Sequence, residues 1–398
     1  MPDWLVPAVM SEAVRRARHM CLRYFLTHQS PIEIGLVIHG PEIIDTGKLA
    51  DLVEVLKNLG AVQVVTGGTM ARVAVLDSPV KDLVDITRKM HTSDALSHFS
   101  TKDAIVLANC GKTSATGTFF GQIVSSRVKR SIIQIERLGA RDGRIILWHG
   151  DDSDKADLTE RIALFLADAL KLTLQRTPKK SIHVEHKGDA DVRTVHGAKR
   201  GERILIEGAV IGTVVSTDVE IITRGGRIVD IRGGVIKDHG LEKIGYIDLE
   251  TAYIKTGHLR RNNTARRRSN VVVPARHLNR GRVVVINHVA DRTFEAVDER
   301  TICAVTIGDD TTAISGDILS RVGIPVVGIT DGDADGIYHA ARTVQGSTII
   351  RLQSESDDEI GRLLEEQNVL GYGDYTLDEL KTTIIAFLNH LQVRFIVN

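Results

Sequence analysis

Three aspartates alternate with small residues in the segment TDGDADG, residues 330–336, directly after the apolar run IPVVGI. Carboxylates packed this closely repel one another unless a cation neutralises them. Proteins commonly hold Mg²⁺ with one or two carboxylates together with the phosphates of a substrate. We therefore predict that Asp331, Asp333 and Asp335 bind Mg²⁺. The alternative is a structural turn in which an aspartate caps the following helix.

The elements that must position these aspartates follow an α/β pattern. From residue 282 onward, short apolar runs rich in β-branched residues alternate with amphipathic segments, and a helix is expected over TLDELKTTIIAFLNHL. Strands separated by helices form a mostly parallel sheet, and open α/β sheets bind ligands beyond the carboxyl ends of their strands. The segment TDGDADG is expected at such an end.

Residues 282–352 resemble a Toprim domain, the metal-binding module of topoisomerases, bacterial-type primases and recombination-associated proteins. The resemblance lies in the order of the elements and in the stretch GIPVVGITDGDADG. It implies that Asp331 and Asp333 are metal ligands and catalytic candidates, with Asp335 as an accessory ligand. The family places a glutamate at the end of its first strand and an aspartate four positions later. In this chain Asp291 fits that aspartate and is the third catalytic candidate, but Asn287 stands in the place of the glutamate.

The asparagine changes the chemistry that this site can support. An amide oxygen of Asn287 can coordinate a cation weakly, but it cannot take up a proton as a carboxylate does. The asparagine therefore argues against cleavage of nucleic-acid strands and against nucleotide polymerisation. It argues less strongly against the binding of a metal or a phosphate. Glu295 or the pair Asp309–Asp310 could supply the missing carboxylate.

Residues 33–150 show a similar alternation of apolar runs and helix-length segments. Five of these runs predict the strands of a Rossmann-like, mostly parallel sheet. If the sheet is parallel, the polar residues that follow the strands meet on one rim. They include His39, Glu42, Gly67, Gly68, Lys112, Thr113, Ser114 and His149. The rim is either a set of structural turns or a pocket for a small molecule or nucleotide, with His39, Glu42 and His149 as acid–base candidates.

The segment GKTSATG, residues 111–117, precedes a predicted helix within this rim. Backbone N–H groups at a helix start can bind an anion, and Lys112 would add a positive charge. The segment is not a P-loop, because Val106 stands where the first glycine of that motif is expected. Beside it, Cys110 is either a thiolate activated by these cationic groups or a small buried residue.

The formal net charge of zero is a sum over unequal regions. Residues 251–290 contain nine Lys and Arg and no acid, whereas residues 291–398 contain nineteen Asp and Glu against eight Lys and Arg. Cations without interleaved aromatic residues grip phosphates by charge and do not read bases by stacking. The predicted phosphate or nucleic-acid contacts are Arg260, Arg261, Arg266, Arg267 and Arg268. The alternative is that these arginines pair with the acidic C-terminal part or with a second subunit.

The composition is that of a folded α/β protein with two or three domains, because 42% of the 398 residues are hydrophobic and 26% are charged. Three widely spaced cysteines form no disulfide framework or cysteine zinc site, and no apolar stretch is long enough to span a membrane. A cytoplasmic location is expected. We predict a Rossmann-like domain with an N-terminal helical leader (1–175), a small β-rich domain (181–250), a basic linker (251–281) and a Toprim-like domain with a C-terminal helix (282–398).

The whole chain also resembles a family of archaeal, mainly methanogen, proteins in the stretches HGPEIIDTG and GIPVVGITDGDADGI. This resemblance implies a cytoplasmic archaeal protein and no particular activity. We predict a Mg²⁺-dependent protein, able to form homo-oligomers and without membrane contact, that binds or acts on a nucleotide or nucleic acid. Any turnover would be phosphoryl-transfer or phosphodiester chemistry. The alternatives are a non-catalytic assembly protein with a degenerate Toprim-like domain and a small-molecule enzyme that uses the N-terminal rim.

Overall fold

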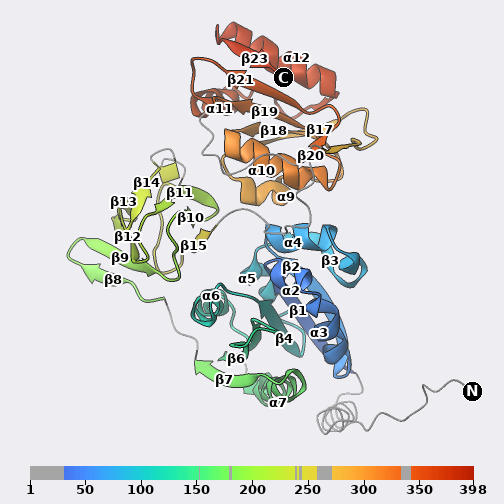
Figure 1. Cartoon of the computed structure of the whole chain (residues 1–398), viewed down its shortest axis with the longest axis vertical. Helices are drawn as coiled ribbons and strands as arrows, with labels where there is room; N and C mark the ends of the chain where they lie inside the picture. Colours follow the sequence, from blue (N-terminus) through green and yellow to red (C-terminus); the bar gives the residue numbers. More distant parts are fainter. Residues whose placement is uncertain are drawn as a thin grey trace, which may run out of the picture. The chain divides into compact units, whose positions relative to one another are not determined.

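The chain has a mixed α/β fold, as the sequence predicts, with several separate sheets (Figure 1). The computed structural model describes residues 31–151, 153–178, 182–237, 240–241, 244–257, 271–332 and 342–398. The chain divides into two compact units, one ending at His183 and the other beginning at Val184. Each unit is described by itself below.

The first unit contains a seven-stranded sheet. In spatial order its strands are β3 (Asp85–Met90), β2 (Gly60–Gly67), β1 (Ile32–His39), β4 (Ala104–Asn109), β5 (Ile132–Glu136), β6 (Arg144–His149) and β7 (Thr173–Pro178). The first five strands run parallel to one another, because every pair among β3, β2, β1, β4 and β5 is parallel. Strand β6 is antiparallel to β5, and β7 runs parallel to β6.

The direction of β6 corrects one prediction from the sequence. Only seven residues separate β5 from β6, whereas a crossover between parallel strands needs about a dozen or more. The chain therefore turns back as a hairpin, and Trp148 pairs with Ile132 at the beginning of β5. His149 consequently lies at the opposite edge of the sheet from the carboxyl ends of the parallel strands. The expectation that His149 joins the other rim residues is wrong.

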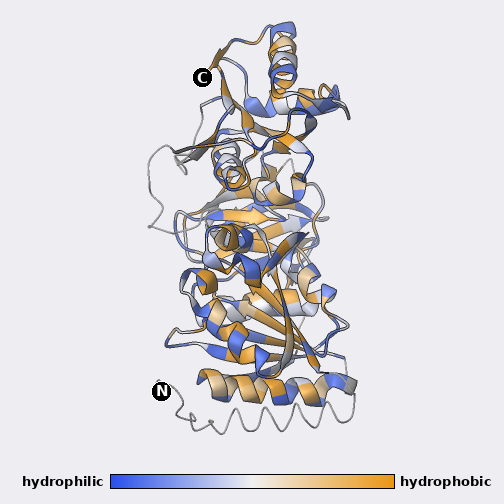
Figure 2. Cartoon of the chain, turned by 90° about the vertical axis from the view of Figure 1, so that its right-hand side faces the viewer, coloured by the Kyte–Doolittle hydropathy of each residue, from blue (hydrophilic) through white to orange (hydrophobic). Residues whose placement is uncertain are grey.

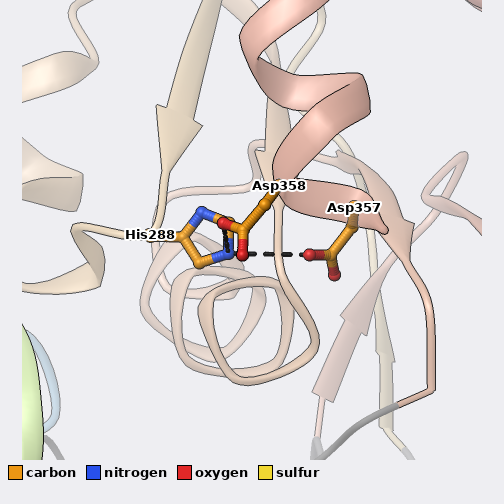
Figure 3. A group of neighbouring side chains, drawn as sticks. All are labelled: His288, Asp357 and Asp358. Carbon is orange, nitrogen blue, oxygen red and sulfur yellow. Dashed lines mark ion pairs between the residues drawn. The ribbon is translucent and has the colours of Figure 1, made fainter. Parts of the chain in front are cut away.

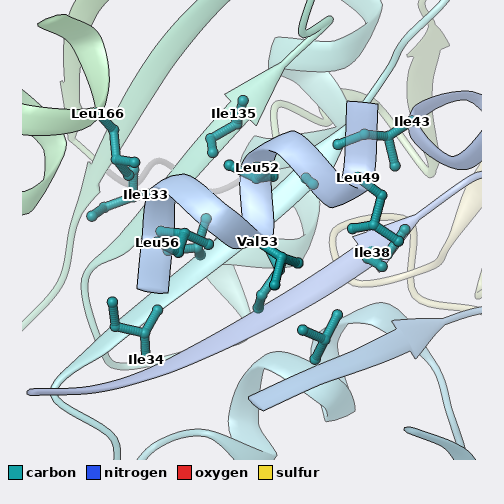
Figure 4. Close-up of a cluster of buried hydrophobic side chains, with 14 of the residues drawn as sticks. Ile34, Ile38, Ile43, Leu49, Leu52, Val53, Leu56, Ile133, Ile135 and Leu166 are labelled. Atoms are coloured by element: carbon teal, nitrogen blue, oxygen red, sulfur yellow. The ribbon is translucent and has the colours of Figure 1, made fainter. Parts of the chain in front are cut away.

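Helices cover both faces of this sheet. Their bounds are α2 (Glu42–Asp45), α3 (Lys48–Lys57), α4 (Thr69–Leu76), α5 (Thr92–His98), α6 (Ser114–Ser126) and α7 (Ser153–Leu170), with a 3-10 turn, η1, at Pro79–Leu83. Leu49, Leu52 and Leu56 of α3 pack with Ile34 and Ile38 of β1, and α4 and α7 contribute to the same core (Figure 4). Helices α5 and α6 pack on the other face, in a core that contains Val37 of β1. Neighbouring residues of β1 thus point to opposite layers.

Two four-stranded antiparallel sheets form the β-rich part of the second unit and enclose a shared apolar core. One contains β13 (Arg227–Arg232), β12 (Val219–Arg224), β9 (Ala190–Val195) and β8 (Glu185–Lys187). The other contains β14 (Gly234–Ile236), β11 (Ala209–Val214), β10 (Arg203–Ile206) and β15 (Ile254–Gly257). Between β12 and β13, Gly225 and Gly226 have φ angles of 53° and 73°. Both glycines thus have the positive φ that a two-residue type I′ hairpin turn requires.

The remaining part of the second unit contains a six-stranded sheet. Its order is β22 (Asp374–Tyr375), β17 (Gly281–Asn287), β18 (Thr301–Ile307), β19 (Val326–Thr330), β21 (Thr348–Leu352) and β23 (Phe395–Val397). The four central strands are parallel, and the two edge strands are antiparallel to their neighbours. A separate pair joins β16 (Val271–Val273) to β20 (Arg342–Val344).

Helices lie on both faces of the six-stranded sheet as well. They are α9 (Thr293–Ala296), α10 (Asp309–Ser320), α11 (Asp357–Glu366) and α12 (Leu377–His390), and a 3-10 turn, η3 (Ala290–Arg292), precedes α9. Leu319 of α10 packs with Ala304 of β18, whereas α11 and α12 pack with Val305. Because adjacent strand residues point to opposite faces, α10 and the pair α11–α12 cover different faces.

Hydrophobic residues dominate the strands, whereas the helices carry both hydrophobic and hydrophilic residues along their length (Figure 2). Each helix can therefore bury one side and expose the other. Among the helices that the structure describes, none is long and apolar enough to cross a membrane.

Two helical glycines provide a test of this packing. A Cβ on Gly117 of α6 would fall on the Glu136 carboxylate, whereas one on Gly316 of α10 would lie 3.6 Å from Val326 Cγ2. Overpacking costs about 1–3 kcal/mol, while alanine is favoured over glycine in a helix by about 1 kcal/mol. We expect Gly117→Ala to lower the free energy of unfolding and Gly316→Ala to raise it, in chemical denaturation followed by circular dichroism. Equal effects of the two substitutions would contradict this packing.

Candidate metal centre

Four polar side chains lie at the carboxyl ends of the four central parallel strands of the second unit. His288 follows β17, Asp309 follows β18 after one glycine, and Asp331 follows β19 directly. Asp357 is the first residue of α11, which begins shortly after β21. Because parallel strands end at the same edge of a sheet, four segments that are distant in sequence meet there.

Asp309, Asp331 and Asp357 form a group that can hold a metal ion. Each offers one carboxylate oxygen, and these oxygens all lie within 4.8 Å of one another. Asp309 and Asp331 are partly exposed, whereas Asp357 is only 4% exposed. The group therefore combines one buried carboxylate with two that solvent can reach.

Backbone hydrogen bonds tie the three strand ends together. The Gly332 N–H donates to Asp309 Oδ2 at 2.9 Å, and the Asp357 N–H donates to Asp331 Oδ2 at 3.4 Å. Gly308 and Gly332 have φ angles of 102° and 88°. Residues with a Cβ atom rarely adopt such positive angles, whereas glycine does so readily. The glycines therefore allow both turns to bring their aspartates inward.

A second group shares Asp357 with the first and consists of His288, Asp357 and Asp358 (Figure 3). His288 Nε2 lies 3.1 Å from Asp358 Oδ1 and 3.6 Å from Asp357 Oδ1. On its other side, the ring places Nδ1 2.5 Å from Asn287 Oδ1. Because an amide oxygen only accepts hydrogen bonds, Nδ1 is the donor, and the ring is held with Nε2 toward the carboxylates.

The carboxylate oxygen Oδ2 of Asp357 is buried and provides the strongest indication of a bound cation. Among the residues that the structure describes, no group donates a hydrogen bond to this buried oxygen. Leaving a buried polar atom without a partner costs about 1–3 kcal/mol, and more if the group is charged. A cation bound between the carboxylates would supply the missing interaction, and oxygen ligands favour Mg²⁺ or Ca²⁺ over softer metals.

The structure brings some of the predicted site residues together and separates others. Asp331 belongs to the carboxylate group, and so does Asp309, which the sequence offers as a substitute for the missing glutamate. Asn287 lies at the end of β17 and contacts His288. Asp291 instead lies 3.5 Å from Lys255 Nζ of β15 and belongs to neither group. Asp333 and Asp335 lie outside the described residues.

Sequence reasoning missed His288, Asp357 and Asp358. A signal was present, because Ser356 followed by Asp357, Asp358 and Glu359 after an apolar run is typical of a capped helix start. The structure confirms that Ser356 caps α11, since its side chain accepts from the Asp358 N–H. The buried position of Asp357, however, follows only from the packing of α11 against the sheet.

The structure describes residues 251–257 and 271–290 of the basic stretch. Four of the cations there contact hydrogen-bond or ion-pair acceptors of this chain. Lys255, Arg280 and Arg282 form ion pairs with Asp291, Glu379 and Asp298. Arg276 donates to the carbonyl oxygens of Val322 and Asp298 at 2.6 and 3.0 Å. These contacts fit the alternative of pairing with the acidic C-terminal part. The five arginines predicted as phosphate contacts, Arg260, Arg261, Arg266, Arg267 and Arg268, lie outside the described residues.

At the rim of the first unit, the GKTSATG turn uses several of its own amides. The Gly111 N–H donates to Glu136 Oε1 at 2.6 Å, and Thr113 and Thr116 form a reciprocal capping box at the start of α6. Ser114 is the first residue of α6 and is buried, and Lys112 is exposed. The buried carboxylate of Glu136 thus already binds one of the amides at which the sequence predicts a bound anion.

Other rim residues take the predicted places at the ends of β1 and β2. His39 ends β1, Glu42 begins α2, and Gly67 and Gly68 join β2 to α4. Burial raises the pKa of the Glu42 carboxyl. His149 lies at the opposite edge, for the reason given above.

Cys110, next to this turn, is not an activated thiolate. Burial, together with the nearby carboxylates of Glu42 and Glu136, raises the pKa of its thiol to about 11. The positive charge of Arg137 opposes this effect only in part. Cys110 is partly buried, so the structure argues against the activated thiolate without making the residue a fully buried one.

The raised pKa predicts slow alkylation of Cys110. At pH 8 iodoacetamide should modify it roughly a hundredfold more slowly than an ordinary cysteine, because the thiolate is the reactive form. The rate should rise up to about pH 11, and Glu42→Gln should increase the rate at pH 8 by removing a negative charge. Peptide mass spectrometry measures the rate at this position. A fast reaction at pH 8, with a rate that does not rise toward pH 11, would instead show that Cys110 is an activated thiolate.

Comparisons with known proteins match most of the chain to one family. The sequence profile of the family described as "Uncharacterized protein conserved in archaea (DUF2117)" matches residues 36–371. A Methanocaldococcus jannaschii protein, "Uncharacterized protein MJ0065", is 41% identical over 338 residues, which cover 84% of this chain and 91% of that protein. No solved structure matches the chain. With most of its length matched in both comparisons, the chain belongs to the archaeal family DUF2117.

Proposed function

We propose that the C-terminal part of the chain binds Mg²⁺ through Asp309, Asp331 and Asp357 and, through the metal, a phosphate-containing ligand. The ligand class is a nucleotide or nucleic acid. The observation that carries the proposal is the buried Asp357 carboxylate, which shares a site with two other carboxylates and has an oxygen without a described hydrogen-bond donor.

Electrostatics supports a cation at this position. Three carboxylates whose oxygens lie within 4.8 Å of one another repel strongly when all are ionised, and burial of Asp357 reduces the screening by water. A divalent cation reverses the sign of these interactions. Since the donor atoms are carboxylate oxygens, Mg²⁺ with several waters or phosphate oxygens in its remaining positions fits the group.

The residues at the site favour binding over turnover. A bound metal can neutralise phosphate charge and lower the pKa of a coordinated water. A carboxylate base at the end of β17 would assist such chemistry, but the amide of Asn287 stands there, and the Nε2 atom of the neighbouring His288 faces Asp357 and Asp358. The comparisons name no Toprim domain, so that resemblance stays a prediction, and the proposal depends on the carboxylate group alone.

Magnesium should stabilise the wild-type protein and not its carboxylate variants. Binding at a hundred times the dissociation constant adds about 2.7 kcal/mol to the free energy of unfolding. We expect MgCl₂ to raise the melting temperature of the wild type, and Asp331→Asn and Asp357→Asn to abolish the increase. Without magnesium, both variants should be at least as stable as the wild type, because a repulsive charge is removed. Differential scanning calorimetry and titration calorimetry measure both effects.

Asp378→Asn is a matched control for Asp357→Asn. Both aspartates lie in the first turn of a helix of the second unit, but Asp378 is exposed and belongs to neither group of possible metal ligands. This variant should respond to magnesium as the wild type does. Identical magnesium responses of the wild type and both site variants would exclude the metal site.

A random single-stranded oligonucleotide tests the phosphate ligand. We expect binding that requires Mg²⁺, weakens as salt rises and is lost when Arg266, Arg267 and Arg268 are changed to alanine, because neutralised phosphates release counterions. Fluorescence anisotropy at several salt concentrations measures the affinity, with Arg280→Ala as a control for an arginine already paired with Glu379. No binding at low salt would exclude nucleic acid and leave nucleotides, which the same assay tests with labelled ATP.

A further inference from the structure

The imidazole of His288 meets two carboxylates through its Nε2 atom. This nitrogen lies 3.1 Å from Asp358 Oδ1 and 3.6 Å from Asp357 Oδ1, and Figure 3 shows both carboxylates turned toward it. Since Asn287 Oδ1 accepts from Nδ1, a neutral ring presents only a lone pair at Nε2. Ionised carboxylates also only accept hydrogen bonds. A positive species must therefore lie at Nε2, either a second proton of the ring or a metal ion.

A second proton on the ring would satisfy only part of this group. It would join Nε2 to Oδ1 atoms, whereas Oδ2 of Asp357 would stay buried without a donor among the described residues. The helix dipole favours acids in the first turn of α11, which accounts for an exposed side chain such as Glu359. It does not account for Asp357, which is only 4% exposed. A metal ion satisfies both His288 and the buried carboxylate.

The surroundings of His288 leave its Nε2 atom free to bind an ion. A Cβ on Gly308 would lie 2.9 Å from Nε2, so the glycine keeps space beside this nitrogen. The side chains of His288 and Asp358 are 18% and 25% exposed, so solvent and ions can reach the group. On the other side of the ring, the hydrogen bond from Nδ1 to Asn287 is of the kind that orients histidine ligands in metal sites.

The donor atoms of this group differ from those of the magnesium site. One imidazole nitrogen joins two carboxylates, whereas Asp309, Asp331 and Asp357 offer oxygen alone. Mg²⁺ favours oxygen ligands, and imidazole nitrogen suits Zn²⁺ and its neighbours among the transition metals. Zinc sites combine histidine with carboxylates, and a water molecule or ligand can complete three protein ligands. The group therefore fits a different ion from the one beside it.

We propose that His288, Asp357 and Asp358 form a second metal site, which binds a divalent transition metal ion such as Zn²⁺. Asn287 is its positioning residue, because it orients the ring of His288. The inference rests on the proposed function in one respect, since Asp357 belongs to both groups of ligands. A carboxylate has two oxygens and can serve two ions. The two sites differ in their other ligands, so substitutions can separate them.

Zinc titration of the untagged protein in excess MgCl₂ tests the second site. We expect the wild type to bind one more zinc ion than His288→Asn in titration calorimetry. Asparagine is chosen because it tolerates the left-handed backbone of this position, where φ is 58°. Asp358→Asn should lose the same zinc ion and serves as the second variant if His288→Asn does not fold. Both variants should keep the increase in melting temperature with MgCl₂.

Two further substitutions separate this site from the magnesium site. Asp309→Asn should lose the magnesium response and keep the zinc ion, whereas Asp357→Asn should lose both. His390→Gln is the matched control, because His390 is an exposed histidine of the second unit that belongs to neither group. It should bind zinc and magnesium as the wild type does. Zinc binding without any magnesium response in the wild type would contradict the proposed function alone.

Nitrogen-15 NMR of histidine-labelled protein shows whether His288 binds the ion directly. Zn²⁺ should shift the Nε2 resonance of His288, assigned by its loss in His288→Asn, and leave Nδ1 protonated. Asn287→Ala should weaken zinc binding about 10–100-fold, because the ring loses its orienting acceptor, and Asn287→Asp should restore it. Equal zinc binding by the wild type, His288→Asn and Asp358→Asn would overturn the inference. So would a His288 resonance that zinc does not move.

Discussion

The parallel pairing of β17, β18, β19 and β21 is the constraint on which the candidate metal centre depends. Parallel register places the ends of all four strands at one edge, so that Asp309, Asp331 and Asp357 approach one another although they lie up to 48 positions apart in the sequence. Like charges oppose this approach. Burial of Ile307 and Ile329 in the core beneath the site holds the strands in place, so the apolar core offsets the repulsion above it.

The sequence predicts one part of this site because Asp331 directly follows the apolar strand β19. An apolar run followed by alternating aspartates indicates a polar strand end within one short window. Asp357 and His288 reach the site from other strands, so their contribution depends on the order and direction of the pairing, which local patterns do not contain. Loop length, by contrast, is visible in the sequence. The short segment between β5 and β6 excludes a parallel crossover and would have separated His149 from His39 at the outset.

Turn motifs are ambiguous for a related reason. The sequence GKTSATG shows which amides exist, but it does not show what they bind. In the folded chain, Glu136 reaches the Gly111 amide from the neighbouring strand β5, and Thr113 and Thr116 satisfy each other. An internal carboxylate thus takes the role that an external phosphate would have in a P-loop. Anion sites can be inferred from sequence only where such internal acceptors are known to be absent.

A bound cation would change the balance of charge within the second unit. Lys255, Arg280 and Arg282 are each paired with an acid of the same unit, so they add little free positive potential for a polyanion. The carboxylate group at the strand ends would by itself repel phosphate. A bound divalent cation changes the sign of the local potential and turns the same group into an attractive surface. If the chain binds phosphate, metal binding must therefore come first, and the order of binding is a consequence of the arrangement of its carboxylates.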